Sequence, residues 1–181
     1  TTDAMEVVNE ILIPALDSAG KLFEQGKIFL PQLIQTASVA QAAFEVIKTT
    51  LIERNAAPVS RGEIVLATVK GDIHDIGKNI VRVLLENYGY TVLDLGRDVP
   101  CQLVADTAKE HGVKLVGLSA LMTTTLGAME ETIQLVKQSC PDCKIVVGGA
   151  VLTADYAEKI GADFYAKDAM ETVAVAKEVV G

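Results

Sequence analysis

The residues most suited to chemistry lie in one short segment, residues 71–77, whose sequence is GDIHDIG. The segment contains His74, one of only two histidines in the chain, and a neutral imidazole is the commonest metal ligand among protein side chains. A carboxylate on the other ring nitrogen fixes the tautomer of such a ligand and raises its basicity, and Asp72 or Asp75 could supply it. This combination indicates a metal-binding histidine.

Two glycines in the same segment indicate that the ligand is bulky. Gly71 permits backbone angles that other residues avoid, and Gly77 leaves the first turn of the following helix without a side chain. A lone histidine in a loop is more often an ordinary polar residue or a helix cap. The glycines and carboxylates around His74 favour a binding site instead.

A buried strand leads into this segment. Residues 63–69, with the sequence EIVLATV, are almost continuously apolar, as in a parallel strand that is covered on both faces. Ligands of open parallel α/β sheets collect outside the carboxyl ends of the strands. We therefore expect His74 to face the ligand crevice of such a sheet.

From residue 62 onward, strand patterns alternate with helix patterns through five rounds. The expected strands are Ile64–Val69, Thr91–Asp94, Leu115–Ser119, Lys144–Val147 and Asp163–Tyr165. The expected helices are about Ile76–Tyr88, Gln102–Glu110, Leu126–Ser139, Ala154–Ile160 and Ala169–Val179. This alternation predicts an α/β fold, a five-stranded parallel sheet of the flavodoxin-like (Rossmann-like) type with strand order 2-1-3-4-5. In that order the loops after the first and third strands share one crevice.

Two helices are expected before the sheet, because apolar residues recur at helical spacing over residues 4–25 and about 30–54. Pro14 should kink or divide the first helix, since proline removes a ladder hydrogen bond and crowds the preceding turn. Two helices cannot close a bundle alone. Either the sheet domain covers their apolar face, or further helices of the bundle lie outside this sequence.

A linker is expected between the helices and the sheet. Residues 55–62, with the sequence NAAPVSRG, combine a proline with small and polar residues. We therefore expect a small all-α domain at residues 1–57 and an α/β domain at residues 58–181.

Three motifs, in this order along the chain, resemble the cobalamin-binding signature of corrinoid-dependent methyltransferases and carbon-skeleton mutases. They are Asp72-x-His74-x-x-Gly77, Ser119-x-Leu121 and Gly148-Gly149. The likeness covers essentially the whole chain, because residues 1–57 are similar to the helical cap that these methyltransferases place over the corrin. Residues 70–81 are most similar to cobalamin-dependent methionine synthase, and free-standing methylamine or methanol corrinoid proteins share much of this segment.

The resemblance implies roles for three residues, which we expect to be catalytic. His74 would bind the cobalt of cobalamin from below, in place of the benzimidazole of the cofactor (base-off, His-on). Asp72 would hydrogen-bond His74, and Thr125 would continue the relay, so that the three together control the charge around the metal.

The resemblance also implies which residues contact the rest of the cofactor. Those expected near the corrin, beside Asp72, His74 and Thr125, are Gly71, Ile73, Asp75, Gly77 and Leu121. Those expected along the slot for the nucleotide tail are Ser119, Thr123, Gly148, Gly149 and Ala169. Phe23 and Leu30 would cover the upper, methyl-bearing face. Taken singly, such residues are often ordinary turn or core residues.

The function that the resemblance implies is methyl transfer through methylcobalamin. The chain would be the cobalamin-binding module of a methyltransferase, and it would carry a methyl group from methyltetrahydrofolate to homocysteine. It offers no residues that would activate either substrate, so we expect methyl-donor and methyl-acceptor domains or subunits as partners, together with a reactivation partner. An alternative is a stand-alone corrinoid protein of a methylamine or methanol system. The small subunit of an adenosylcobalamin mutase is less favoured, because mutases need no two-helix lid.

Other classes of protein fit the sequence poorly. A signalling receiver needs a phospho-accepting aspartate at the end of the third strand, where this chain has Gly117-Leu118-Ser119. No glycine-rich phosphate loop follows the first strand. Cys140-x-x-Cys143 lacks the further ligands of a zinc site, and we expect it to be a solvent-facing turn.

Composition limits the partners and the compartment. The net charge is −8, and the lysines and arginines are scattered, so no nucleic-acid surface is expected. No apolar run reaches the roughly 20 residues that span a bilayer, and no leader pattern is present. The three cysteines are too few for a disulfide framework. We therefore expect a cytoplasmic protein that does not contact membranes.

Overall fold

A computed structural model describes residues 7–53 and 60–181 of the chain. Its centre is a five-stranded, all-parallel sheet with the order β2-β1-β3-β4-β5. The strands are β1 (Glu63–Thr68), β2 (Thr91–Asp94), β3 (Leu115–Ser119), β4 (Lys144–Gly148) and β5 (Phe164–Tyr165). The expected flavodoxin-like α/β fold is confirmed. In the register of β1 and β3, Thr68 lies opposite Ser119, so the loops that follow these strands are neighbours.

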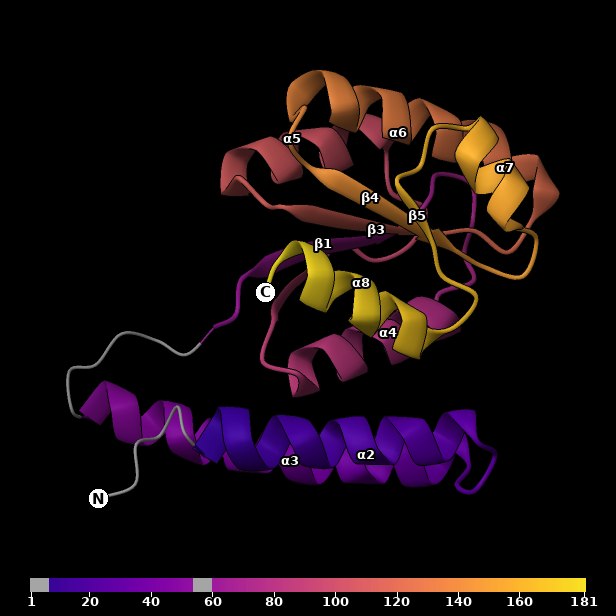
Figure 1. Ribbon diagram of the computed structural model, residues 1–181. Coiled ribbons are helices and arrows are strands. Elements are labelled where there is room, and N and C mark those ends of the chain that lie inside the picture. Colours follow the sequence, from indigo (N-terminus) through magenta and orange to yellow (C-terminus); the bar gives the residue numbers. More distant parts are fainter. Residues whose placement is uncertain (1–6, 54–59) are drawn as a thin grey trace.

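Helices cover both faces of the sheet (Figure 1). One face carries α4 (Ile76–Asn87) and α8 (Ala169–Val179), and the other carries α5 (Cys101–His111), α6 (Leu126–Ser139) and the short α7 (Ala154–Lys159). Successive strand residues point to opposite faces. Val65 and Ala67 of β1 therefore pack towards α5 and α6, and Ile64 and Leu66 pack towards α4 and α8. Among the described helices, none has the length and apolar character needed to cross a membrane.

The N-terminal helices form a further layer on the outer side of α4 and α8 (Figure 1). They are α2 (Ile13–Glu24) and α3 (Leu30–Glu53). One apolar core joins the two layers, and its buried residues include Leu16, Ala19, Leu33 and Ala37 from the cap and Leu84, Leu85, Tyr88 and Val173 from the α/β part. An ion pair between Asp17 and Lys177 crosses the same boundary. The α/β part therefore covers an apolar face of the helix pair, as one of the two alternatives expected.

The first helical segment changes its hydrogen bonding next to Pro14. A π-helical turn, η1 (Val8–Leu12), runs directly into α2, and Pro14, which has no N–H to donate, is the second residue of α2. The expected helix start at Ala4, helix end at Arg54 and domain boundary between residues 57 and 58 all lie outside the described residues.

The Cys140–Cys143 turn between α6 and β4 differs from the expected solvent-facing turn. Pro141 and Asp142 are exposed, but the Cys143 side chain packs into the core of the α5–α6 face. Burial, helped by the neighbouring Cys140, raises the pKa of the Cys143 thiol to about 12. A thiol that stays protonated is a poor nucleophile and a poor metal ligand. Cys143 is therefore a core residue.

Candidate functional site

The carboxylate of Asp72 is the centre of the candidate site, and it is fully buried. Its Oδ1 accepts a hydrogen bond from the backbone N–H of His74 at 3.0 Å and lies 2.8 Å from Nδ1 of the His74 ring. Its Oδ2 accepts from the backbone N–H groups of Leu121 at 2.7 Å and Met122 at 3.2 Å, and from the Thr125 hydroxyl at 3.2 Å. Asp72 thereby joins the loop after β1 to the loop after β3.

These contacts keep Asp72 ionised. Burial raises the pKa of a carboxyl group, but hydrogen bonds from His74, Leu121 and Met122 outweigh it and lower the pKa of Asp72 to about 2. An ionised carboxylate can only accept hydrogen bonds, so Nδ1 of His74 carries the proton in their 2.8 Å contact. In the neutral ring, Nε2 is then the nitrogen with the free lone pair. The side chain of His74 is 46% exposed, so a ligand can reach that nitrogen.

The hydroxyl of Thr125 has two acceptors and one hydrogen. Its Oγ1 lies 3.2 Å from Oδ2 of Asp72 and 2.8 Å from the carbonyl oxygen of Met122. The hydroxyl can donate to one of them at a time, and it can change acceptor by rotation about a single bond. Thr125 can therefore adjust the hydrogen bonding of Asp72 without any movement of the backbone.

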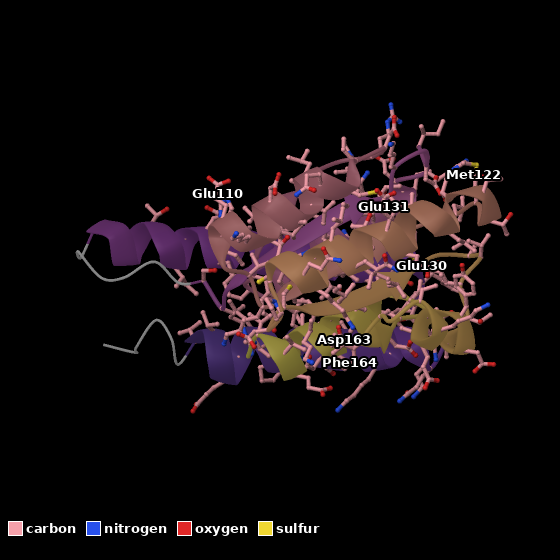
Figure 2. The ribbon with its side chains drawn as sticks, turned by 90° about the horizontal axis from the view of Figure 1, so that it is seen from above. Glu110, Met122, Glu130, Glu131, Asp163 and Phe164 are labelled. Atoms are coloured by element: carbon pink, nitrogen blue, oxygen red, sulfur yellow. The ribbon has the colours of Figure 1, made fainter. Side chains whose placement is uncertain are left out.

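A cavity of about 820 Å³ opens beside His74. Its walls come from the loops after β1, β3, β4 and β5, from α4 and from the two ends of the α2–α3 turn. In Figure 1 this turn and the carboxyl ends of the strands lie on the same side of the molecule. Seen from above, Met122 lies near that end and Glu110 lies towards the opposite end (Figure 2). Most of the residues expected from the sequence line this cavity: Phe23, Leu30, Ile73, His74, Asp75, Gly77, Ser119, Leu121, Gly148, Gly149 and Ala169.

Four expected residues do not line the cavity. Asp72 and Thr125 are buried behind His74. Gly71 lies in the turn immediately before Asp72. Thr123, which the resemblance assigned to the tail slot, is exposed at the start of the turn η2 (Thr123–Thr125). The 3₁₀ turn brings only its last residue inward, so Thr125 faces Asp72 and Thr123 does not.

The cavity extends along the face of the sheet that α4 and α8 cover. Leu66, Gly117 and Val146 line it and are neighbours in the register of β1, β3 and β4. A Cβ atom on Gly117 would lie only 2.5 Å from Cδ2 of Leu66. Gly117 was not singled out from the sequence, although a glycine inside an apolar strand indicates a close approach by another group. The glycine lets the side chain of Leu66 lie across β3, and both residues form part of the cavity wall.

The glycines at the mouth of the cavity have different surroundings. A Cβ atom on Gly77 would meet nothing within 4 Å, so the protein itself does not require a glycine there. Gly149 has a φ of 138°, and a Cβ atom there would collide with the carbonyl oxygen of Ala120. Gly149 is therefore needed for the close approach of two loops, whereas Gly77 leaves free space beside His74.

Two cationic residues also line the cavity and were not singled out from the sequence. Lys78 is 3% exposed and forms an ion pair with Asp94 of β2 at 2.5 Å. Arg97, in the loop after β2, is exposed at the mouth. The sequence holds little sign of the Lys78 pair, because its partner lies 16 residues away on a neighbouring strand.

These features fit a corrinoid, a cofactor that brings most of the ligands of its own metal. His74 offers one free nitrogen beside a wide cavity mouth, and the cavity continues along the sheet past Gly117, which gives room for a long substituent. The chain matches the B12 binding domain family over residues 62–174, and a second B12 binding domain family over residues 1–48.

Comparison with known proteins agrees with this family. The chain is 43% identical over 180 residues to dimethylamine corrinoid protein 1 of Methanosarcina acetivorans, which covers 98% of this chain and 84% of that protein. It is similar to the crystal structure of a cobalamin-binding protein from Desulfitobacterium hafniense, with a TM-score of 0.84, 34% identity and coverage of 98% and 84%. It is also similar to the methanol:cobalamin methyltransferase complex MtaBC of Methanosarcina barkeri, with a TM-score of 0.82, 30% identity and coverage of 97% and 67%.

The comparisons confirm the expected cofactor and correct the expected subfamily. The expectation of a methionine synthase is not supported, since these relatives are named as corrinoid proteins and a methanol system. They agree with the alternative that the sequence left open. The chain belongs to the B12 binding domain family, and its cofactor is a corrinoid.

Proposed function

We propose that this chain is the methyl carrier of a methylamine methyltransferase system and that His74 is the lower axial ligand of its cobalt. The observation that carries the proposal is the 2.8 Å contact between Asp72 and Nδ1 of His74, which leaves Nε2 free beside the cavity. The bound corrinoid supplies a cobalt ion that accepts and releases methyl groups. The higher identity to the dimethylamine protein than to the methanol complex favours an amine as the methyl source.

In this proposal Asp72, His74 and Thr125 form one proton-holding unit. Asp72 fixes the tautomer of the ring, so that Nε2 presents its lone pair whenever a metal is bound. When Nε2 is not bound to a metal, the Nδ1–H group still donates to the ionised carboxylate of Asp72, so the ring keeps its tautomer and its direction. The Thr125 hydroxyl adjusts by rotating between Asp72 and the carbonyl oxygen of Met122. Charge near the metal is thereby balanced within the protein.

The remaining residues of the proposed site bind the cofactor and exclude water. Ser119, Gly148, Gly149 and Ala169 border the part of the cavity that runs along the sheet, which suits the displaced nucleotide tail. Phe23 and Leu30 add an apolar wall from the cap, and apolar walls shield a reactive cofactor from water and from competing reagents. A partner that exchanges methyl groups needs access to this cavity, so the cap has to move during the cycle.

The test measures methyl transfer with defined partners. The chain is loaded with hydroxocobalamin, reduced, and mixed with dimethylamine and a dimethylamine-specific methyltransferase. We expect the visible spectrum of methylcobalamin to form in proportion to the amine. Faster methylation with methanol and a methanol-specific partner would assign the chain to that system. Methyl transfer to homocysteine by a homocysteine-binding domain, with no response to amines, would contradict the proposal.

Variants of the two histidines provide a matched control for this assay. His74→Ala should still bind the corrinoid but lose most of the methylation rate, because the metal has lost its protein ligand. His111 is exposed, lies at the end of α5 and pairs with Glu63 at 3.1 Å, so His111→Ala should behave as the unchanged protein. Equal rates for the two variants would remove His74 from the reaction.

A further inference from the structure

Asp98, in the loop between β2 and α5, has an unusual backbone conformation. Among residues 7–53 and 60–181, it alone of the non-glycine residues has a positive φ, at 52°. This left-handed region is unfavourable for residues with a Cβ atom, and aspartate tolerates it because its short polar side chain can bond to nearby backbone. Such a conformation persists where the surrounding contacts require it.

Asp98 is hydrogen-bonded to the start of the His74 loop at two points. Its Oδ1 accepts from the backbone N–H of Gly71 at 2.7 Å, and its own backbone N–H donates to the carbonyl oxygen of Asp72 at 2.9 Å. The next residue, Val99, donates to the carbonyl oxygen of Thr68 at 3.1 Å, at the end of β1. The two contacts of Asp98 are therefore anchored to the sheet.

Asp72 is consequently held on two sides by two different loops. The loop after β3 binds its carboxylate, and Asp98 binds its carbonyl oxygen. The preceding Gly71 has a φ of 84° and lies in a turn that the N–H of Asp72 closes with the carbonyl oxygen of Val69 at 3.0 Å, and Asp98 adds the partner of the Gly71 N–H. Among the described residues, Asp72 is the side chain that hydrogen-bonds the His74 ring, at 2.8 Å. The direction of the imidazole therefore depends on how firmly Gly71 and Asp72 are fixed.

We propose that Asp98 is a positioning residue for His74. It fixes the backbone of Gly71 and Asp72, so that Nε2 already points into the cavity before the corrinoid arrives. Preorganisation of this kind strengthens binding, because less ordering remains to be done when the ligand binds. The inference rests on the proposed function in one respect, that His74 is the ligand of the metal.

Two substitutions separate the side-chain hydrogen bond from the backbone conformation. Asp98→Asn keeps an oxygen acceptor, and asparagine also tolerates the left-handed region, so this variant should behave as the unchanged protein. Asp98→Gly relieves the backbone but removes the acceptor for Gly71. We expect Asp98→Gly to bind hydroxocobalamin about fivefold more weakly, as for the loss of one hydrogen bond of ordinary strength, and to hold a larger fraction of the cofactor without a histidine ligand.

The experiment reads binding, ligation and local order separately. Titration with hydroxocobalamin gives the dissociation constant, and the visible spectrum gives the fraction with a histidine ligand, with His74→Ala as the reference that lacks it. Amide hydrogen exchange of the cofactor-free protein gives the order of the loop. In Asp98→Gly, we expect faster exchange at the N–H groups of Gly71 and His74, and an unchanged thermal midpoint by far-UV circular dichroism.

Each alternative result decides the matter. Wild-type affinity, spectrum and exchange in Asp98→Gly would overturn the inference. General loss of the fold in that variant would also overturn it, since Asp98 would then be a residue of global stability. Losses in Asp98→Asn as large as in Asp98→Gly would show that the acceptor oxygen is not the cause. If His74→Ala has the wild-type spectrum, the proposed ligand fails, while the exchange data still report whether Asp98 orders the loop.

Discussion

At the scale of single residues, five donor groups surround the two oxygens of Asp72: two from His74 and one each from Leu121, Met122 and Thr125. A buried carboxylate without such donors would take up a proton and become neutral. Their presence makes Asp72 a fixed negative charge next to the imidazole ring of His74. The negative charge of Asp72 is therefore held in place whether or not the cofactor is bound.

The first prediction concerns the pH dependence of stability in the cofactor-free protein. The pKa of Asp72 is lowered from 3.8 to about 2 by folding. The unfolded chain therefore takes up this proton first, and the stabilising contribution of Asp72 is complete above about pH 4 and is lost as the pH falls to about 2. We expect a loss of about 2 kcal/mol from this residue.

The measurement compares urea unfolding of the wild-type protein and of Asp72→Asn at pH 5 and at the lowest pH at which both fold. Other carboxylates titrate in the same range, so the contribution of Asp72 is read from the difference in free energy of unfolding between the two proteins. This difference should shrink as the pH falls. Parallel profiles would mean that Asp72 is not held in its ionised form.

The second prediction concerns the hydroxyl of Thr125. Thr125→Val keeps the shape of the side chain and removes the donor to Asp72 and Met122, whereas Thr125→Ser keeps the donor and removes the methyl group. We expect Thr125→Val to lower the free energy of unfolding of the cofactor-free protein by about 1 kcal/mol. Urea unfolding measures it. A larger loss in Thr125→Ser would indicate that packing of the methyl group, and not hydrogen bonding, is what matters.

At the scale of structural elements, the first turn of α4 and the loop after β4 give opposite predictions for glycine substitutions. Gly77 has open space around its Cβ position, so Gly77→Ala should stabilise the cofactor-free protein slightly, by up to about 1 kcal/mol, through its higher helix propensity. It should weaken corrinoid binding, because the methyl group occupies space beside His74. Thermal unfolding and hydroxocobalamin titration measure the two effects.

Gly149→Ala is the comparison for this third prediction. Its Cβ atom would meet the carbonyl oxygen of Ala120, so this variant should lose stability with or without cofactor. If Gly77→Ala also destabilises the cofactor-free protein, the glycine is structural, and the space beside His74 is not reserved for a ligand.

The elements themselves were largely predictable from the sequence. Each helix and strand of the α/β part begins and ends within one residue of its expected bounds. Continuous apolar runs indicate strands covered on both faces, and Gly89, Gly112 and Gly161 mark helix ends, where all three have positive φ. The turn η2 was not predictable, because Thr123 and Thr125 have the same side chain and only the 3₁₀ geometry separates the exposed one from the buried one.

Contacts between distant segments were less accessible from the sequence. Asp98 follows a strand in a polar loop, and its partner Gly71 lies 27 residues earlier. The buried pair of Lys78 and Asp94 is hidden in the same way. Such contacts depend on the register of neighbouring strands. Local patterns in the sequence do not reveal that register. The proposed metal ligand, His74, could be singled out because its motif is local.

At the scale of the whole molecule, the cap and the α/β part share one apolar core, which leads to a fourth prediction. The cofactor-free protein should unfold in a single transition. All four tyrosines lie between residues 88 and 165 and the chain has no tryptophan, so tyrosine emission comes from the α/β part, including Tyr88 in the shared core. Far-UV circular dichroism reports both parts. The two signals should give the same midpoint in urea.

A core substitution in the cap sharpens this test. Leu16 is 2% exposed in the shared core, and Leu16→Ala should lower the stability seen by tyrosine emission by about 3 kcal/mol. Val39 is 68% exposed on α3, and Val39→Ala is the control with little effect. A Leu16→Ala variant with unchanged tyrosine emission and an early loss of helical signal would mean that the cap unfolds independently.

The substrate was the part of the function that the sequence could not decide. In the proposed function the residues around His74 hold the cofactor, a task that methionine synthases and methylamine or methanol corrinoid proteins would share. In the proposed function the methyl donor and acceptor are bound by partner proteins. Similarity across the whole chain, and not the motif at residues 71–77, separated these subfamilies.

The central claim, that His74 binds cobalt, is tested most directly by electron paramagnetic resonance of the protein loaded with unlabelled cofactor and reduced to cob(II)alamin. The protein is prepared with ¹⁵N-histidine in the His111→Ala background, so that His74 is the only labelled side chain. We predict that the superhyperfine splitting from the axial nitrogen changes from the ¹⁴N pattern to the ¹⁵N pattern. A spectrum that keeps the ¹⁴N pattern, or lacks axial nitrogen splitting, would contradict the account.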